Sequence, residues 1–208
     1  MASNAPPPNP SPLSIIQATE SSIPAVLHLF DTAVEWLVSQ NRTGQWGTAP
    51  FSTNPQRPDQ LREFITTGHG LWLVVKPFPP TTTDTGNDAI NPVTIHTSPP
   101  GIIVGALAVG DKMPYVPAVD EPEVYVRMLI AARTYVGDGI GKRLLEHARG
   151  IARKAGVSLM RVDCYGGDDE KLVKYYESQG FRRVLRLEPK ENWPCQVLEM
   201  RVEGEEGC

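Results

Sequence analysis

Apolar positions along the chain repeat with two periods, one typical of helices and one typical of strands. In residues 25–38 and 140–152 they recur every third or fourth position, which is the spacing of a helix that buries one face. Residues 71–75, 101–110 and 123–132 are instead dense or alternating apolar runs, as in buried strands. The two periods together predict an α/β protein.

Turn and capping residues indicate where these helices and strands begin and end. Ser21 or Ser22, followed by Pro24, offers a helix start, and Gly156 and Gly180 are natural helix ends. The predicted elements are, in order, strand 13–18, helix 21–40, helix 58–67, strands 71–75, 101–110 and 123–132, helix 139–154, strand 159–165, helix 168–179, and strands 181–187 and 197–202. This order predicts one mixed sheet with helices on its faces.

Proline marks the segments outside this pattern. The chain has 20 Pro and 18 Gly in 208 residues. Residues 1–12 are predicted to be a flexible Pro-rich arm, and 204–208 a tail. The stretch 77–100 holds six Pro and six Thr, and a loop of that length is either a tolerated insertion or a flap over an active site. The domain itself is predicted to span 13–203.

Charge and cysteine usage exclude several classes of protein. The formal net charge is −4, whereas a general nucleic-acid binder is usually basic. The chain has no run of 18 apolar residues that would predict a membrane span, and the N-terminus does not resemble a signal peptide. Three widely spaced cysteines and four histidines show neither a disulfide framework nor metal-ligand spacing. We therefore expect a soluble cytoplasmic protein without a metal, a nucleic-acid partner or a membrane partner.

A glycine-rich segment separates the strand 123–132 from the strongest helix. Gly137, Gly139 and Gly141 stand at alternate positions just before and inside the helix start. Glycines permit a tight turn with exposed amides, and a helix N-terminus carries partial positive charge. The segment is therefore a candidate site for a pyrophosphate, and the alternative is a sharp turn without a ligand.

A dinucleotide is one ligand for such a loop. Its fingerprint is GxGxxG followed by an acid about 20 residues later, and Asp163 lies 24 residues beyond Gly139. The observed spacing is GxGxG, however, and only 67 residues follow the motif. A nicotinamide-dinucleotide enzyme is thus kept as a minor alternative.

Two sequence motifs resemble a known family. MLIAARTYVGDGIGKRLL resembles the acetyl-CoA motif of the GNAT superfamily of N-acetyltransferases, usually (Gln/Arg)-x-x-Gly-x-(Gly/Ala). KLVKYYESQGF resembles the next motif of that family, a helix that ends in Tyr-x-x-x-Gly-Phe. The resemblance covers residues 123–200. It implies the GNAT fold, a central mixed and mostly antiparallel sheet of about seven strands flanked by about four helices, with acetyl-CoA as co-substrate.

The resemblance assigns a coenzyme site. The backbone of Leu129, Ile130 and Ala131 would pair with the pantetheine arm. The pyrophosphate would lie on Val136, Gly137, Asp138, Gly139, Ile140, Gly141 and Lys142. Two positions depart from the family: Val136 stands where Arg or Gln is usual, and Asp169 stands near a position where many relatives carry an Asn that faces the pantetheine.

The resemblance also implies catalytic roles. Tyr176 occupies the motif tyrosine, which would protonate the departing thiolate; the alternative is a tyrosine that only packs on the sheet. Glu123, near the start of its strand, is the first candidate for the general base, although an ordinary solvated acid fits the position equally. Tyr125, on the same face of the strand, would orient the acceptor.

The acceptor pocket of the family lies between the first helices and the last strands. Trp46 is a candidate wall of that pocket, and Glu35 is a candidate partner for a cationic amine. We therefore expect acetyl transfer from acetyl-CoA to a primary amine of a small amine, an amino sugar or a polyamine. The alternatives are a non-catalytic acyl-CoA-binding module and an acetyltransferase for protein N-termini or lysines. The family also implies a homodimer.

Overall fold

The computed structural model describes residues 13–78, 94–95 and 101–203. The predicted arm 1–12, the tail 204–208 and most of the predicted insertion 77–100 lie outside the described residues. The division of the chain into arm, domain and tail therefore stays a prediction.

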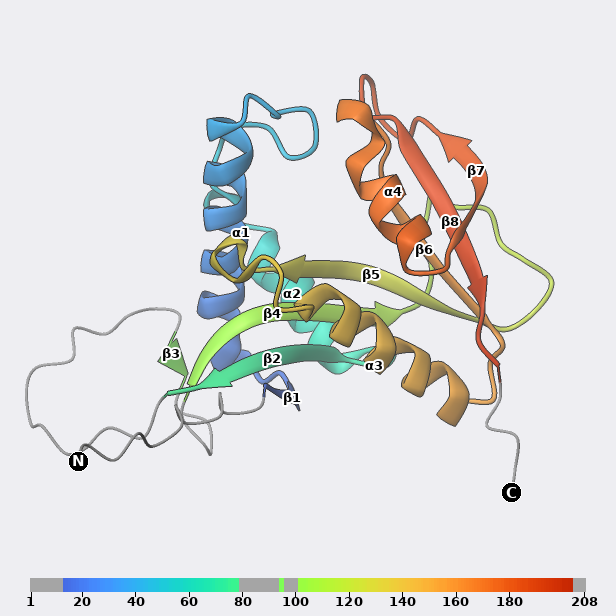
Figure 1. The fold of residues 1–208 in the computed structure, drawn as a ribbon, viewed down its shortest axis with the longest axis horizontal. Coiled ribbons are helices and arrows are strands. Elements are labelled where there is room, and N and C mark those ends of the chain that lie inside the picture. Colours follow the sequence, from blue (N-terminus) through green and yellow to red (C-terminus); the bar gives the residue numbers. More distant parts are fainter. Residues whose placement is uncertain (1–12, 79–93, 96–100, 204–208) are drawn as a thin grey trace, which may run out of the picture.

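One mixed sheet forms the centre of the molecule (Figure 1). Its strands follow the order β1-β2-β4-β5-β6-β8-β7, and the two-residue β3 pairs with β4 beside this path. The strands are β1 Ser14–Gln17, β2 Leu71–Pro77, β3 Thr94–Ile95, β4 Gly101–Gly110, β5 Glu123–Ala131, β6 Leu159–Tyr165, β7 Arg182–Leu187 and β8 Cys195–Arg201. All neighbouring strands are antiparallel except β5 and β6. The predicted mixed, mostly antiparallel sheet is confirmed.

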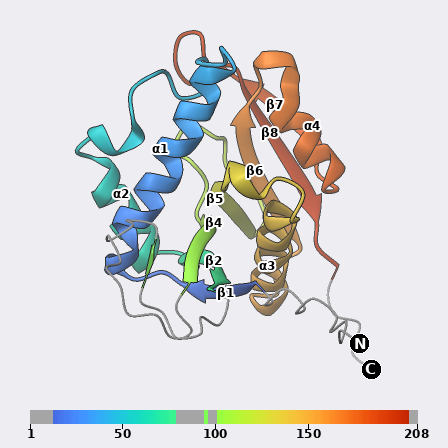
Figure 2. The same cartoon turned by 60° about the vertical axis from the view of Figure 1, so that its left-hand side comes forward.

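Four α-helices cover the two faces of this sheet. They are α1 Ile23–Ser39, α2 Arg57–Thr66, α3 Ile140–Lys154 and α4 Lys171–Ser178. Figure 2 shows α1 and α2 on one side of the sheet and α3 and α4 on the other. Each pair covers its own apolar cluster, because each helix has the apolar stripe that its sequence period predicts.

The last predicted helix begins later than expected. Asp168, Asp169 and Glu170 have φ angles of 50°, 60° and 58°, so a left-handed turn precedes α4. Residues other than glycine adopt this conformation at a cost of about 1–3 kcal/mol each. No residue pattern predicts this turn, and the short strand β3 was not predicted either.

The sheet divides between β5 and β6. These strands pair only from Glu123 with Leu159 to Val126 with Val162, and then diverge. Figure 1 shows β6, β8 and β7 turned away from the β1–β5 part of the sheet. At Arg127 the register with β4 shifts, so that β5 carries a bulge at the point of divergence. This opening positions the candidate site.

None of the helices in the described ranges is both long and apolar enough to cross a lipid bilayer.

Candidate active site

A cavity of about 440 Å³ lies where β5 and β6 diverge. Its walls come from both layers of helices as well as from the two strands: Phe30 of α1, Phe64 of α2, Leu129 of β5, Cys164 of β6 and Tyr176 of α4 all line it. It therefore joins the α1–α2 face of the sheet to the α3–α4 face.

A larger cavity of about 910 Å³ runs along α3 beside β1 and β2. Trp72 and His147 meet there edge to face. Gly139 and Lys142 at the start of α3 line this larger cavity. It contains neither the divergent strand edges nor Tyr176, so we place the reacting groups of the candidate active site in the smaller one.

The start of α3 has the geometry expected of an anion site. Gly137 and Gly139 have φ angles of 100° and 69°, which favour glycine. Gly139 is the N-cap of α3, and no side chain caps the helix. The amides of the first turn are thus left for another acceptor. Gly141 has a different role, because a Cβ there would collide with the hydroxyl of Tyr175 on α4.

The inner edge of β5 is open beyond the last β6 pair. Leu129, Ile130 and Ala131 pair with β4 on one side, whereas the pairing with β6 ends at Val126. The backbone groups of these three residues that face the divergence have no strand partner in the described sheet. An extended chain with amide groups could pair with them.

Side chains around the start of α3 contribute little to the candidate anion site. Val136 is 77% exposed, and Asp138, Ile140 and Lys142 also belong to this segment, with only Ile140 buried. Arg133 cannot stand in for the missing Arg or Gln at position 136, because its guanidinium stacks 3.9 Å from the centre of the Trp36 ring. The segment therefore offers mainly backbone amides.

Tyr176 reaches the cavity from α4. Its ring packs edge to face on Phe181, with 5.6 Å between the centroids. Burial, with a further contribution from Cys164, raises the pKa of the Tyr176 phenol well above its usual value. The hydroxyl has no hydrogen-bond partner among the described residues. Tyr176 is therefore a protonated donor in an apolar wall.

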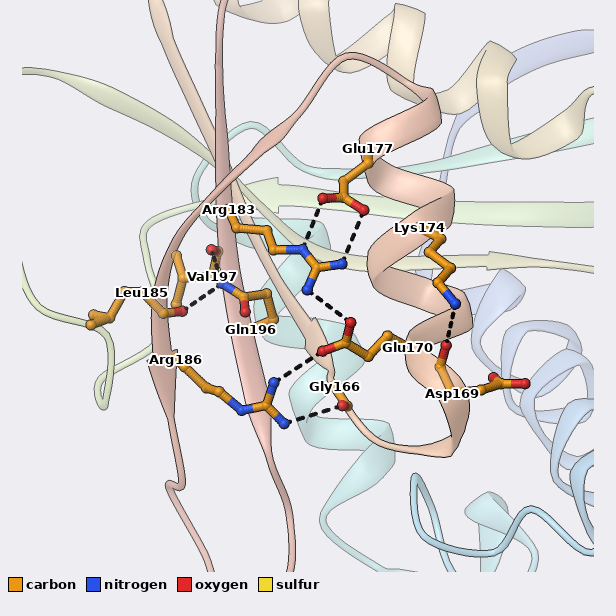
Figure 3. A network of polar contacts seen from close by, with 10 residues as sticks. All are labelled: Gly166, Asp169, Glu170, Lys174, Glu177, Arg183, Leu185, Arg186, Gln196 and Val197. Carbon is orange, nitrogen blue, oxygen red and sulfur yellow. Dashed lines mark hydrogen bonds and ion pairs between the residues drawn. The ribbon is translucent and has the colours of Figure 1, made fainter.

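A network of ion pairs fixes the helix that carries Tyr176 (Figure 3). Arg183 of β7 donates to both Glu177 of α4 and Glu170 of the left-handed turn, each at 2.8 Å. Arg186 reaches the same Glu170 at 3.0 Å. These bonds hold the pKa of the Glu170 carboxyl below its usual value, and they tie the start of α4 to the sheet.

Glu123 is not brought to the cavity. Its carboxylate pairs with Arg161 of β6 at 3.0 Å, and the two side chains are only 13% and 4% exposed. Arg161 is a buried charge that needs a partner. The structure thus places Glu123 in a buried ion pair outside the cavity, and the general-base role that the sequence suggested stays a prediction.

Asp163 of β6 is the acid that does line the cavity. Its two oxygens accept hydrogen bonds of 2.8 Å from Tyr125 and Tyr115. Burial first, and then Asp163, raise the pKa of both phenols, so each stays a donor. Tyr125 is fully buried and is not a lining residue; it acts on the cavity through Asp163. The sequence singled out Asp163 only as a candidate ribose ligand.

On the acceptor side, one expected residue is present and one is not. Trp46 lines the cavity beside Phe30 and Phe51, with 5.4 Å between the Trp46 and Phe30 ring centroids. Glu35 is exposed and does not line it, because α1 directs its apolar stripe to the sheet and Glu35 to the opposite side. The structure therefore does not bring Glu35 to the cavity, and its contact with an acceptor amine stays a prediction.

Hydrogen bonds connect the loop after α1 to the segment before β8 and to the turn before α4. Trp193 donates from Nε1 to the carbonyl of Gln45 at 2.9 Å, and both residues line the cavity. Arg42 donates to the Asp168 carbonyl at 2.7 Å and to the Asp169 carboxylate at 3.0 Å. Asp169, expected to face the pantetheine arm, is thus engaged by Arg42 and is not a lining residue.

Cys164 is the one lining thiol in the described part of the chain. Burial, followed by the nearby Asp163 charge, raises its pKa to about 12. Because the thiolate is the nucleophilic form, this residue does not favour a covalent acyl-enzyme route. In the same ranges, no three His, Cys, Asp or Glu side chains gather as metal ligands would.

Comparisons with known proteins agree with this geometry. Residues 84–181 match the model of the acetyltransferase (GNAT) family. No curated protein sequence matches the chain.

Solved structures show the same fold. The yncA protein of Salmonella typhimurium, in a structure with its cofactor acetyl-CoA, is 13% identical, with a TM-score of 0.56 over 94% of this chain and 96% of that one. An N-acetyltransferase from Staphylococcus aureus Mu50 is 14% identical, with a TM-score of 0.58 over 93% and 100%. The ribosomal-protein-S18-alanine N-acetyltransferase of Escherichia coli is 14% identical, with a TM-score of 0.56 over 94% and 99%. The two motifs, the divided sheet and the match over residues 84–181 show that this chain is similar to the GNAT family of acetyltransferases.

Proposed function

We propose that this protein transfers the acetyl group of acetyl-CoA to the primary amine of a small molecule. The observation that carries the proposal is the cavity between β5 and β6, where Leu129 at the open edge of β5, Tyr176 and Asp163 line the same space. On the family resemblance alone, we also propose a cytoplasmic homodimer.

The residues present fit the coenzyme. The amides from Gly137 to Lys142 would hold the pyrophosphate, supported by the partial positive charge of the helix. The free edge of Leu129, Ile130 and Ala131 would pair with the pantetheine amides. The exposed Val136 contributes no charge, so that backbone amides do most of the holding.

Asp163 and Tyr176 divide the proton transfers. Asp163 holds the acceptor amine by a charge-assisted hydrogen bond and takes the proton that the nitrogen loses as it attacks the thioester carbonyl carbon. Tyr176 donates its proton to the sulfur as the carbon–sulfur bond breaks. Tyr115 and Tyr125 keep the Asp163 carboxylate in place. Positioning and these charge interactions lower the barrier.

The hydrogen bonds between segments of the cavity wall favour a small acceptor. The Trp193–Gln45 hydrogen bond joins two lining residues from segments 148 positions apart. Arg42 makes a second connection to the turn before α4. A lysine side chain or an N-terminus on a folded protein would have to pass between these fastened segments. A free small molecule needs much less room.

Calorimetric titration with acetyl-CoA, with NAD in parallel, tests the coenzyme. We expect micromolar binding of acetyl-CoA alone, followed by thiol release when amines are added. Binding of NAD alone would refute the proposal. Binding of acetyl-CoA without transfer to any amine would leave the alternative of a non-catalytic acyl-CoA-binding module.

Asp163→Asn is expected to lower kcat/KM for the acceptor amine about 100-fold, a common size for the loss of a proton acceptor. The affinity for acetyl-CoA should stay within about twofold, because Asp163 is not part of the α3 start. Steady-state kinetics with thiol detection measures the first quantity and calorimetry the second.

Glu123→Gln is the matched comparison. It leaves Arg161 buried without its counter-charge, so the thermal unfolding midpoint should fall while turnover per folded molecule is retained. A large loss of turnover in Glu123→Gln and none in Asp163→Asn would identify Glu123, and not Asp163, as the general base.

A further inference from the structure

The acceptor side of the cavity contains more positive than negative charge. Arg57 of α2, Arg127 of β5 and Lys190 before β8 line it, against the single carboxylate of Asp163. The whole chain, in contrast, has a net charge of −4. Cations concentrated in a cavity of an acidic protein indicate an anionic group on the ligand.

Arg57 gives the strongest support for an anionic group on the ligand. Its guanidinium stacks 4.0 Å from the centre of the Phe51 ring and donates to the Gln60 side chain at 2.7 Å. No carboxylate of the described residues forms an ion pair with it, and its Nε is buried without a hydrogen-bond partner. Burial lowers the pKa of Arg57, because the guanidinium has lost water without gaining a charged partner. An anionic ligand would supply that partner.

Arg127 provides a second cation in the same cavity. It stands at the bulge of β5, which turns its side chain onto the Phe64 ring at 4.7 Å. Its Nη1 pairs with Glu63 at 3.1 Å, while its Nε is also buried and unpartnered. Each of the two arginines therefore retains free donor capacity.

The two arginines and the carboxylate come from different strands and helices around the divergence. Arg57 and Arg127 come from α2 and β5, and Asp163 comes from β6. The rest of the lining is largely aromatic and apolar and includes Phe51, Trp46 and Met128. A ligand that satisfies these charges and this lining has an ammonium, a carboxylate and an apolar side chain.

We infer that the acceptor is a free amino acid with an apolar side chain, whose amine faces Asp163 and whose carboxylate binds Arg57 and Arg127. This inference rests on the proposed transfer reaction and specifies its substrate class. It differs from the polyamine or amino sugar that the sequence suggested, because neither offers a carboxylate to the two arginines. Planar guanidinium groups match carboxylates in particular.

Paired acceptors test the inference. L-phenylalanine, L-leucine and L-methionine are compared with phenethylamine, 3-methylbutylamine and 3-(methylthio)propylamine, which lack only the carboxylate; L-phenylalaninamide keeps the shape without the charge. We expect kcat/KM to be about 10- to 100-fold higher for the best amino acid than for its amine, the range for hydrogen bonds to a charged group. Equal or better use of the amines or the amide would overturn the inference.

Variants localise the effect. Arg57→Gln should raise KM for the amino acid about 10- to 100-fold, and should remove most of its advantage over the matched amine. Arg62→Gln, on the same helix, is the control: Arg62 is an exposed residue that pairs with Asp59 and does not line the cavity, so the amino-acid preference should be unchanged. An equal loss of preference in both variants would contradict the role of Arg57.

Binding separates this inference from the proposed reaction. The CoA-loaded protein is titrated with the same compounds by calorimetry. Tighter binding of the amino acid that disappears in Arg57→Gln, without any transfer, would refute the reaction and keep the ligand class. Transfer to the amines with no preference for the amino acids would refute the ligand class and keep the reaction.

Discussion

Gly139→Glu is expected to weaken acetyl-CoA binding at least about 100-fold, which is on the order of 3 kcal/mol. The φ angle of 69° at this N-cap already disfavours any residue with a Cβ. In addition, the carboxylate would place negative charge at the point where the amides of α3 are proposed to hold a pyrophosphate. Calorimetric titration of both proteins gives the ratio of dissociation constants.

Two further variants separate charge from strain. Gly139→Ala adds a Cβ without charge, and it should weaken binding much less. Gly150→Glu puts the same charge in the middle of the same helix, where nothing lies within 4 Å of a new Cβ, and it should leave the affinity unchanged. Circular dichroism checks that each variant is folded. An unaltered acetyl-CoA affinity in folded Gly139→Glu would show that the coenzyme does not bind at this turn.

Tyr176→Phe should lower kcat about 100-fold or more, the usual size of a lost general acid. The phenylalanine keeps the ring contact with Phe181, so the fold and the coenzyme affinity should change little. Because burial raises the pKa of the phenol, Tyr176 stays protonated through the neutral range and causes no alkaline loss of activity there. Kinetics of thiol release from pH 6 to 9 measures both effects.

Tyr175→Phe is the matched control for this prediction. The neighbouring hydroxyl is buried against Gly141 and has no hydrogen-bond partner in the described part of the chain. Its removal should leave kcat within about twofold. Equal turnover in Tyr176→Phe and the unmodified protein would exclude Tyr176 from the mechanism.

The fold could be predicted from the sequence because its signals are local. Apolar period, prolines and glycines placed β4 at the observed limits, and α3 within one residue of them. The left-handed turn before α4 could not be predicted in this way. Its stabilising partners are Arg183 and Arg186, which follow the helix in sequence and meet Glu170 only in the folded chain.

The site could be predicted only in part, for the same reason. The glycine turn and Tyr176 belong to contiguous motifs; the structure has positive φ angles at Gly137 and Gly139 and Tyr176 in the cavity wall. The role of an isolated acid depends on distant partners. Glu123 forms an ion pair with Arg161, 38 positions later, whereas Asp163 accepts a hydrogen bond from Tyr115, 48 positions earlier. Neither pairing has a signature in the sequence.

The brief contact between β5 and β6 has a consequence for folding cooperativity. Only four residue pairs connect the two parts of the sheet, so the backbone ladder is weakest at the middle of the molecule. A ligand that pairs with β5 inside the divergence adds backbone bonds at that seam, and a ligand that binds only the native state stabilises it in proportion to the logarithm of its concentration. The cellular supply of the acyl donor would then set the resistance of the molecule to unfolding as well as its rate of catalysis.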